Sequence, residues 1–410
     1  MGSEILDLKI TNARVRRGEK GAVVIIGVKD GKITAIAKEL SQQARETLDA
    51  GGGLVTESFV NGHLHLCKVY TLEMAGQAAL GEYHQGGMGG AMTAIERAAD
   101  FKAAYDKSWI LPNVRRACDL ALHYGNTHIR AFADVDSKAR LEGIKALLEA
   151  RAEYSGRVEL QVVAFPQDGV VREKGAAEYV EEALKLGADV VGGIPWIEFS
   201  KGDEQRHIDE MFGLAKKYGK NLSMLLDDVG DPGECTLEMY ALKAIELGWN
   251  GRVTAQHCRA MALYEENYFR KITALMRKAN IGLVADPHTG PLHARVRDLA
   301  AAGINVALGQ DDIADAYYPY GRCNMLEIAF LASHLMWMTS FQDMELLYDM
   351  ITTSAARVLG IQGHVLEPGG NADLVVLKAQ DVYHAIWEHE APVYVIRNGV
   401  VVKPVSAADV

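Results

Sequence analysis

The stretch Ser58-Phe59-Val60-Asn61-Gly62-His63-Leu64-His65-Leu66 is a mostly apolar run that ends in two histidines. Side chains alternate across a strand, so residues 63 and 65 point to the same face and both imidazoles can bind one divalent ion. Such a pair also arises by chance, as packed or surface histidines. Further polar residues at strand ends along the chain favour the metal role for His63 and His65.

Seven more runs rich in β-branched residues follow, separated by amphipathic patterns such as those at residues 138–154, 176–186 and 204–218. A short apolar run followed by an amphipathic helix is typical of a βα unit in a parallel sheet. Eight such units, counting residues 58–66, predict an α/β fold with a closed (β/α)8 TIM-type barrel rather than an open doubly wound sheet. No Gly-X-Gly-X-X-Gly motif follows a strand, which weakens the dinucleotide-binding alternative. The seven strands are expected at 127–132, 158–165, 190–194, 221–226, 252–256, 282–285 and 306–308.

Both ends of the chain are rich in short strand patterns. They lie at residues 8–15, 23–28 and 33–37, and again at 372–377 and 393–401. The last run contains Asn398-Gly399, a favoured hairpin turn. These ends predict one small β-sandwich domain made of residues 1–56 and 360–410, with residues 57–359 forming the catalytic barrel.

The composition excludes several classes of protein. The 410 residues are 49% hydrophobic and carry a formal net charge of −11, whereas nucleic acid or an anionic membrane would require a basic face. No run of about 18 apolar residues is present, so we expect a cytoplasmic protein with a small-molecule substrate, and we also expect a homo-oligomer. The five cysteines form no Cys-X-X-Cys pair, so neither disulfides nor a structural zinc site is expected.

Polar residues that follow the strands of such a barrel converge on one mouth. Asp311 follows the last strand, where it could bind the ion and take a proton from bound water, whose pKa the metal lowers. The alternative is a helix N-cap, which suits Asp312 at least as well. His257 is a candidate metal ligand or a stabiliser of the oxyanion formed in hydrolysis. Its alternative is a histidine hydrogen-bonded in the barrel wall.

Three other polar residues are candidates for handling the substrate. Asp228 could carry a proton to the leaving amine, or it could be a solvated loop acid. Gln167 both donates and accepts hydrogen bonds and would suit an amide-like ring edge, although it could be a plain loop glutamine. Lys68 is a candidate substrate-binding residue, and a lysine that snorkels to the surface is an equal alternative.

Long strings at residues 160–169, 186–195 and 318–321 stand almost as in cytosine deaminases. Nearly the whole chain resembles the cytosine deaminase branch of the amidohydrolase superfamily, which also includes N-isopropylammelide hydrolases. The resemblance implies a (β/α)8 barrel carrying a β-sandwich, with one divalent ion, zinc or iron, and manganese as a further option. It implies that His63 and His65 are the first two metal ligands and that Asp311 is both a ligand and the general base. It also implies that His257 stabilises charge in the reaction, that Gln167 hydrogen-bonds the edge of the ring, and that Asp312 is the acid beside the base.

The chain departs from this family at the site itself. Leu225 stands where the family has a histidine ligand, and Asp228 where it has a longer glutamate proton shuttle. Phe132 and Tyr317 replace a histidine and a tryptophan, and we expect them, with Lys68, in the substrate site. Leu225, Phe132 and Tyr317 make the expected pocket more apolar, which disfavours cytosine itself, a small and fully polar base.

Two explanations compete for the missing ligand. In the first, His257 moves in and zinc's need for three protein ligands is met; the ligands would be His63, His65, His257 and Asp311. In the second, the site binds metal weakly. We favour the first, and with it metal-dependent hydrolysis of a C–N bond, specifically deamination of a pyrimidine- or triazine-like ring, with Asp311 as base and Asp228 as proton carrier. The alternatives are cleavage of a cyclic amide or ureide, and a metal-poor barrel that binds a small molecule without turnover.

Overall fold

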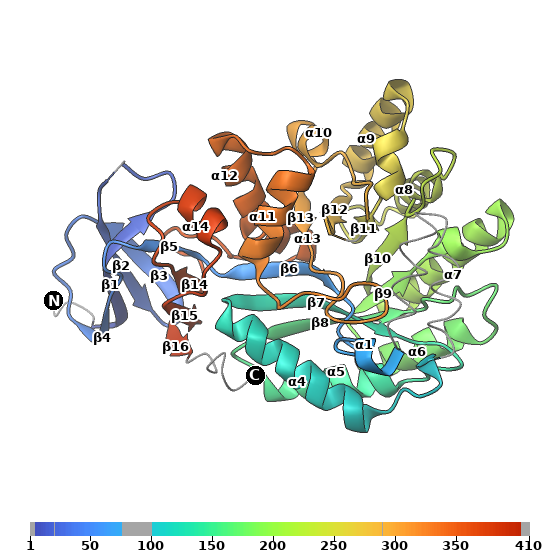
Figure 1. Cartoon of the computed structure of the whole chain (residues 1–410), viewed down its shortest axis with the longest axis horizontal. Helices are drawn as coiled ribbons and strands as arrows, with labels where there is room; N and C mark the ends of the chain where they lie inside the picture. The colour runs from blue at the N-terminus through green and yellow to red at the C-terminus, as the bar shows by residue number, and fades with distance from the viewer. Residues whose placement is uncertain (1–4, 20, 76–100, 289, 403–410) are drawn as a thin grey trace.

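The computed structural model describes residues 5–19, 21–75, 101–288 and 290–402, and its centre is a barrel of eight parallel strands (Figure 1). Neighbouring strands follow the order of the sequence, which confirms the predicted α/β barrel. The strands are β6 (Phe59–Leu64), β7 (Asn126–Asp134), β8 (Glu159–Phe165), β9 (Val190–Gly193), β10 (Asn221–Leu226), β11 (Val253–His257), β12 (Gly282–Ala285) and β13 (Val306–Leu308).

The barrel closes where its first strand meets the end of its last. Leu64 and Asp311 form a parallel bridge. The backbone N–H of His65 donates to the carbonyl of Asp311 at 2.8 Å, and the N–H of Asp311 donates to the carbonyl of His63 at 2.9 Å. This seam places the histidine pair directly beside Asp311.

Helices cover the outside of the barrel (Figure 1), and α7 (Lys201–Tyr218) shows why they form where they do. The Ser200 side chain accepts from the backbone N–H of Asp203 at its start, and Gly219 ends it in the left-handed conformation. None of the described helices is long and apolar enough to cross a membrane. The other helices are α1 (Leu72–Ala75), α4 (Lys107–His123), α5 (Glu142–Glu153), α6 (Ala176–Leu186), α8 (Thr236–Glu246), α9 (Glu266–Ala279), α10 (Val296–Ala301), α11 (Met325–Leu335), α12 (Phe341–Met350), α13 (Thr353–Leu359) and α14 (Val382–Glu388).

One predicted helix begins later than its sequence pattern indicates. The pattern predicted a helix from residue 138, but α5 begins at Glu142. Arg140 has a φ of 53°, a left-handed conformation that does not continue into a right-handed helix. The Asp136 side chain also accepts from the backbone N–H groups of Lys138 and Ala139. These contacts hold the segment as a turn, and the helix starts beyond it.

The two chain ends form a separate sheet beside the barrel (Figure 1). In it, β5 pairs with β1 in parallel and with β14 in antiparallel orientation, so both ends of the sequence contribute. Its own core includes Ile10, Val55 and Leu374. The strands are β1 (Leu6–Val15), β2 (Val24–Lys29), β3 (Lys32–Ala37), β4 (Ala44–Asp49), β5 (Leu54–Glu57), β14 (Leu374–Val376), β15 (Tyr394–Arg397) and β16 (Val400–Val402).

A buried arginine joins this sheet to the barrel. Arg16, just after β1, contacts Glu345 and Asp349 of α12, each at 2.8 Å. Its guanidinium also lies over the ring of Tyr348, 4.6 Å from the centroid. The sheet is therefore tied to a barrel helix by charge-assisted contacts as well as by packing.

Candidate active site

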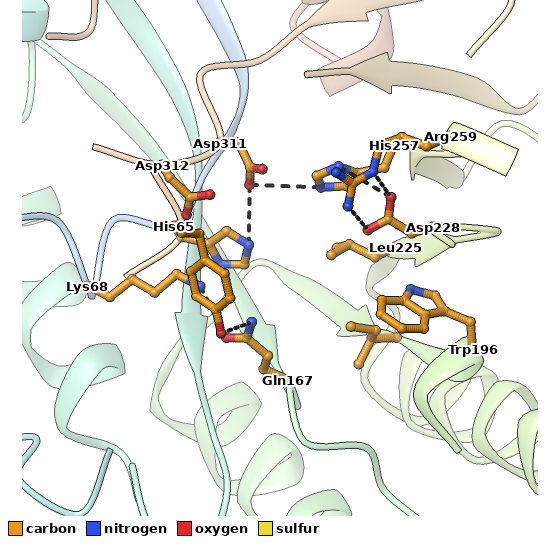
Figure 2. Close-up of a pocket in the computed structure, with 12 residues that line it drawn as sticks. His65, Lys68, Gln167, Trp196, Leu225, Asp228, His257, Arg259, Asp311 and Asp312 are labelled. Carbon is orange, nitrogen blue, oxygen red and sulfur yellow. Dashed lines mark hydrogen bonds and ion pairs between the residues drawn. The ribbon is translucent and has the colours of Figure 1, made fainter. Parts of the chain in front are cut away.

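Three histidines and one aspartate meet at the carboxyl ends of the barrel strands. Nε2 of His63 lies 3.0 Å from Oδ1 of Asp311, and Nε2 of His65 lies 3.5 Å from the same oxygen. Nε2 of His257 is 3.8 Å from it. All four side chains are buried, and Figure 2 shows Asp311 between His65 and His257.

The tautomer of His63 is set by a residue of the neighbouring strand β11. Nδ1 of His63 lies 3.1 Å from Oε1 of Gln256, whose amide nitrogen donates to Ser223. Nδ1 is therefore the donor, and the lone pair of Nε2 faces Asp311. Burial lowers the pKa of His63 to about 3, so the imidazole is neutral at pH 7, the form that binds metals.

The backbone is in the left-handed conformation at or just after the ends of three barrel strands. The φ angles are 46° at Asp227, 62° at His257 and 60° at Asp311. This conformation costs a residue other than glycine about 1 kcal/mol or more, and such residues cluster where function requires a particular direction of a side chain. Asp227 is itself held inward by Tyr264, Thr236 and a backbone N–H.

A pocket of about 400 Å³, part of it open to solvent, lies above this floor. Figure 2 shows Leu225 and Trp196 together on one side of it, opposite Lys68 and Gln167. The apolar residues are Ile194, Trp196, Leu225 and Tyr317, and the polar ones are His65, Lys68, Gln167, Asp228, His257, Arg259, Asp311 and Asp312.

Lys68 is a buried cation on the polar wall. Its Nζ donates to Oε1 of Gln167 at 3.2 Å and lies 4.4 Å from the centre of the Tyr317 ring. Burial alone would lower the pKa of Lys68, but the carboxylates of Asp134 and Asp312 outweigh it and raise that pKa. Lys68 is thus a fixed positive charge and not a snorkelling surface residue.

Two carboxyl groups of the pocket are poised to hold protons near neutrality. Burial raises the pKa of Asp311 to about 6. Burial and the charge of Asp311 raise the pKa of Asp312 to about 7. Neither residue is the N-cap of a described helix, since the next one, α11, is capped by Asn324.

Asp228 is paired with a residue that the sequence reasoning missed. Arg259, in a short 3₁₀ turn after β11, donates to Asp228 from Nε at 2.5 Å and from Nη2 at 3.0 Å. Both side chains are buried at the pocket edge. No strand-end rule identifies Arg259, because a contact two residues beyond a strand depends on how the turn folds.

Phe132 lies below the pocket and does not line it. It is fully buried, and its ring centre is 4.0 Å from that of His63 and 5.5 Å from that of His65. It points there because it belongs to the inner face of β7, packed under the histidine pair. The expected wall residue is instead Trp196, in the 3₁₀ turn after β9.

His63, His65 and Asp311 could hold a divalent ion, because one ligand atom of each lies within 4.8 Å of the other two. Ligand atoms about 2.0–2.2 Å from a tetrahedral zinc lie about 3.3–3.5 Å apart, and Oδ1 of Asp311 lies 3.0 Å and 3.5 Å from Nε2 of His63 and of His65. Nε2 of His63, Nε2 of His257 and Oδ1 of Asp311 are buried and have no hydrogen-bond partner among the described residues. A bound cation would satisfy all three atoms.

A (β/α)8 barrel with imidazole and carboxylate donors at the carboxyl ends of its strands has the architecture of metal-assisted hydrolases. The amidohydrolase family matches residues 46–403. The chain therefore belongs to the amidohydrolase family and is a hydrolase of carbon–nitrogen bonds, which confirms the class expected from the sequence.

Relatives cover almost the whole chain. N-isopropylammelide isopropyl amidohydrolase of Pseudomonas sp. (strain ADP) is 29% identical over 401 residues, 97% of each chain. Pterin deaminase of Rhizobium rhizogenes is 25% identical over 375 residues, 86% of this chain and 82% of that protein. The structure of 5-methylcytosine deaminase from Klebsiella pneumoniae, liganded with 5-fluorocytosine, has a TM-score of 0.87 at 29% identity, covering 97% of this chain and 98% of that one.

Proposed function

We propose that this chain hydrolyses an exocyclic carbon–nitrogen bond of a pyrimidine- or triazine-like ring and releases ammonia or a small amine. The observation that carries the proposal is the convergence of His63, His65 and His257 on Asp311, at the floor of a pocket. The names of the relatives, which refer to ammelide, pterin and methylcytosine, support this class of substrate.

The residues proposed to hold one divalent ion, zinc or iron with manganese as a further option, are His63, His65, His257 and Asp311. When bound, the ion would supply a Lewis acid and lower the pKa of a water molecule toward neutrality. Oδ1 of Asp311 faces the imidazoles, so Oδ2 is the atom that would take a proton as general base. Burial raises the pKa of Asp311, which favours its acceptance of a proton.

Proton delivery to the leaving nitrogen is assigned to Asp228. Both of its oxygens contact Arg259, and this guanidinium opposes protonation of the carboxylate. Burial nevertheless raises the pKa of Asp228 above its usual value, so this carboxyl could carry a proton while Arg259 fixes its position.

Recognition of the ring is assigned to the polar wall. Gln167 offers an amide edge that Lys68 and Tyr317 hold in place, at 3.2 Å and 3.3 Å. Asp312 adds an acid whose pKa is raised to about 7 by burial and by the charge of Asp311. The opposite wall of Trp196, Ile194 and Leu225 is hydrocarbon and aromatic, which favours a ring with an alkyl substituent over an unsubstituted polar base.

The test combines metal analysis with a screen for amine release. Protein loaded with zinc, iron or manganese is assayed on pyrimidines, triazines and pterins, in pairs that differ only in an N-alkyl group. We expect one ion per chain, release of ammonia or amine, and a preference for the alkylated member of a pair. His63→Ala should lose both the ion and turnover, and a variant that retains turnover would contradict the assigned site.

The same assay separates the alternatives. Ring opening without amine release, seen as loss of ring absorbance, would identify a cyclic amide or ureide as substrate. A wild-type protein that takes up no ion, yet binds these rings in calorimetry, would identify a binding barrel. A homo-oligomeric state and a cytoplasmic location stay predictions, and light scattering coupled to size exclusion tests the first.

A further inference from the structure

The buried carboxylate of Asp286, directly after β12, lies beside the floor of the site and has no role so far. Its Oδ2 is 3.7 Å from Nδ1 of His257. The other ring nitrogen, Nε2, is the one that faces Oδ1 of Asp311, at 3.8 Å. The imidazole of His257 therefore has a carboxylate on each side, and neither of its nitrogens has a hydrogen-bond partner among the described residues.

Gly309, directly after β13, leaves space for the carboxylate of Asp286. A Cβ at Gly309 would lie 2.1 Å from Oδ1 of Asp286 and 2.7 Å from Cβ of His63. Contacts this short do not occur, so any side chain at residue 309 would displace Asp286. The chain thus brings Asp286 against the strand that carries the histidine pair.

The charges around His257 indicate which acid serves its Nδ1. Asp228 also lies 3.8 Å from Nδ1, but both of its oxygens are engaged by Arg259. One ligand atom each of His63, His257 and Asp286 also lies within 4.8 Å of the other two, so direct binding of an ion by Asp286 is the competing role, and a double variant separates the two.

We propose that Asp286 is a positioning residue of the metal centre: it accepts the Nδ1 proton of His257 and thereby directs the Nε2 lone pair at the ion. The inference rests on the proposed metal-dependent function. A histidine that binds a metal through one nitrogen usually donates the other N–H to a carboxylate or carbonyl, which fixes the tautomer. Leu225, on the adjacent strand β10, supplies no donor atom, so a correctly oriented His257 is needed to complete the set.

The test measures metal affinity in Asp286→Leu, a substitution of similar size that removes the acceptor. Competition against a chromophoric chelator should show an affinity for Zn²⁺ about 10–100-fold lower than that of the wild type. Asp286→Asn keeps one acceptor oxygen and should lose less. In Co²⁺-loaded protein, the visible absorption of Asp286→Leu should change in the same direction as that of His257→Ala, because both lose the same ligand.

A double variant distinguishes positioning from direct binding. In the His257→Ala background, Asp286→Leu should cause no further loss of affinity. A further loss of similar size would mean that Asp286 acts on the ion without His257, and this would overturn the proposal, as would an unchanged affinity in the single variant.

A matched control excludes a general effect of losing a buried acid. Asp373→Asn removes a buried carboxylate of the terminal sheet, one that accepts from the backbone N–H of Asn398 through Oδ1, and should leave the affinity within about twofold of the wild type. A wild type that binds no ion would refute the proposed function itself, whereas unchanged binding in Asp286→Leu refutes only this inference.

Discussion

Leu225 presents hydrocarbon to the pocket at a position where the cytosine deaminase branch carries a histidine. In the structure it belongs to one apolar cluster with Trp196 and Ile194. We propose that His257 supplies a donor in its place, since its Nε2 lies 3.8 Å from the Asp311 oxygen that the histidine pair also approaches. In this proposal residue 225 makes the wall of the site apolar while imidazole and carboxylate groups stay at its floor.

Part of this arrangement was predictable residue by residue. The rule that polar residues after strands meet at the mouth identified His63, His65 and Asp311. The same rule applies to Asp286, which directly follows the strand at 282–285, so the sequence also indicates this residue, although it was not among the predicted site residues. Arg259 and Gln256 gave none, because their roles depend on which side chain of a neighbouring strand each one meets.

Asp227 should make the stability of the protein depend on pH. Burial raises the pKa of this carboxyl from 3.8 to about 6 in the folded chain. Its stabilising contribution is therefore complete below about pH 4 and is lost as the pH rises through about 6. Asp227→Asn does not titrate, so its free energy of unfolding relative to wild type should be more favourable at pH 8 than at pH 4.5, by about 2 kcal/mol.

Urea unfolding of the two proteins at both pH values measures this difference. Glu181→Gln, which removes an acid on the surface of α6, should show no gain at pH 8. A difference between Asp227→Asn and wild type that does not change with pH would contradict the assignment.

At the level of strands and helices, the sequence predicted the barrel well because hydrophobic period and strand order are both local signals. The expected strands at 221–226, 282–285 and 306–308 coincide with β10, β12 and β13. The start of α5 was missed because it depends on Asp136, which holds the preceding turn from the end of β7. Side-chain capping of this kind leaves little trace in hydrophobic periodicity.

Strand β10 offers a direct test of how the site differs from its relatives. In the parallel ladder, Leu225 lies opposite Gln256 and Leu226 opposite His257, so residue 225 is placed next to the donor set. Leu225→His should restore a nitrogen donor and raise the affinity for Zn²⁺ at least about tenfold. It should also weaken binding of N-alkylated rings, because it removes part of the apolar wall.

Leu225→Gln is the control, since it is polar but a poor metal ligand. Chelator competition on both variants should separate a specific gain in Leu225→His from a general effect of polarity. Equal affinities in the two variants would show that residue 225 does not reach the ion.

For the whole molecule, Arg16 forms ion pairs between the terminal sheet and a barrel helix; its side chain is 7% exposed, and those of Glu345 and Asp349 are 35% and 18% exposed. A half-buried pair lies between the about 1 kcal/mol of a surface ion pair and the about 3 kcal/mol of a buried one. Arg16→Ala should therefore lower the free energy of unfolding by about 2 kcal/mol in urea titrations. Arg17→Ala removes a side chain that is 64% exposed, although it also contacts Asp349, and should cost less than about 1 kcal/mol.

The seam between β6 and Asp311 also sets an order of events during synthesis. The histidine pair leaves the ribosome early and Asp311 late, and the backbone hydrogen bonds that join them cannot form until β13 has been made. Of the proposed ligands, a nascent chain offers an incoming ion only imidazoles until Asp311 has been made. Binding at the proposed site would therefore be tied to synthesis of the last barrel strand, and the ion would fasten the first and last strands together.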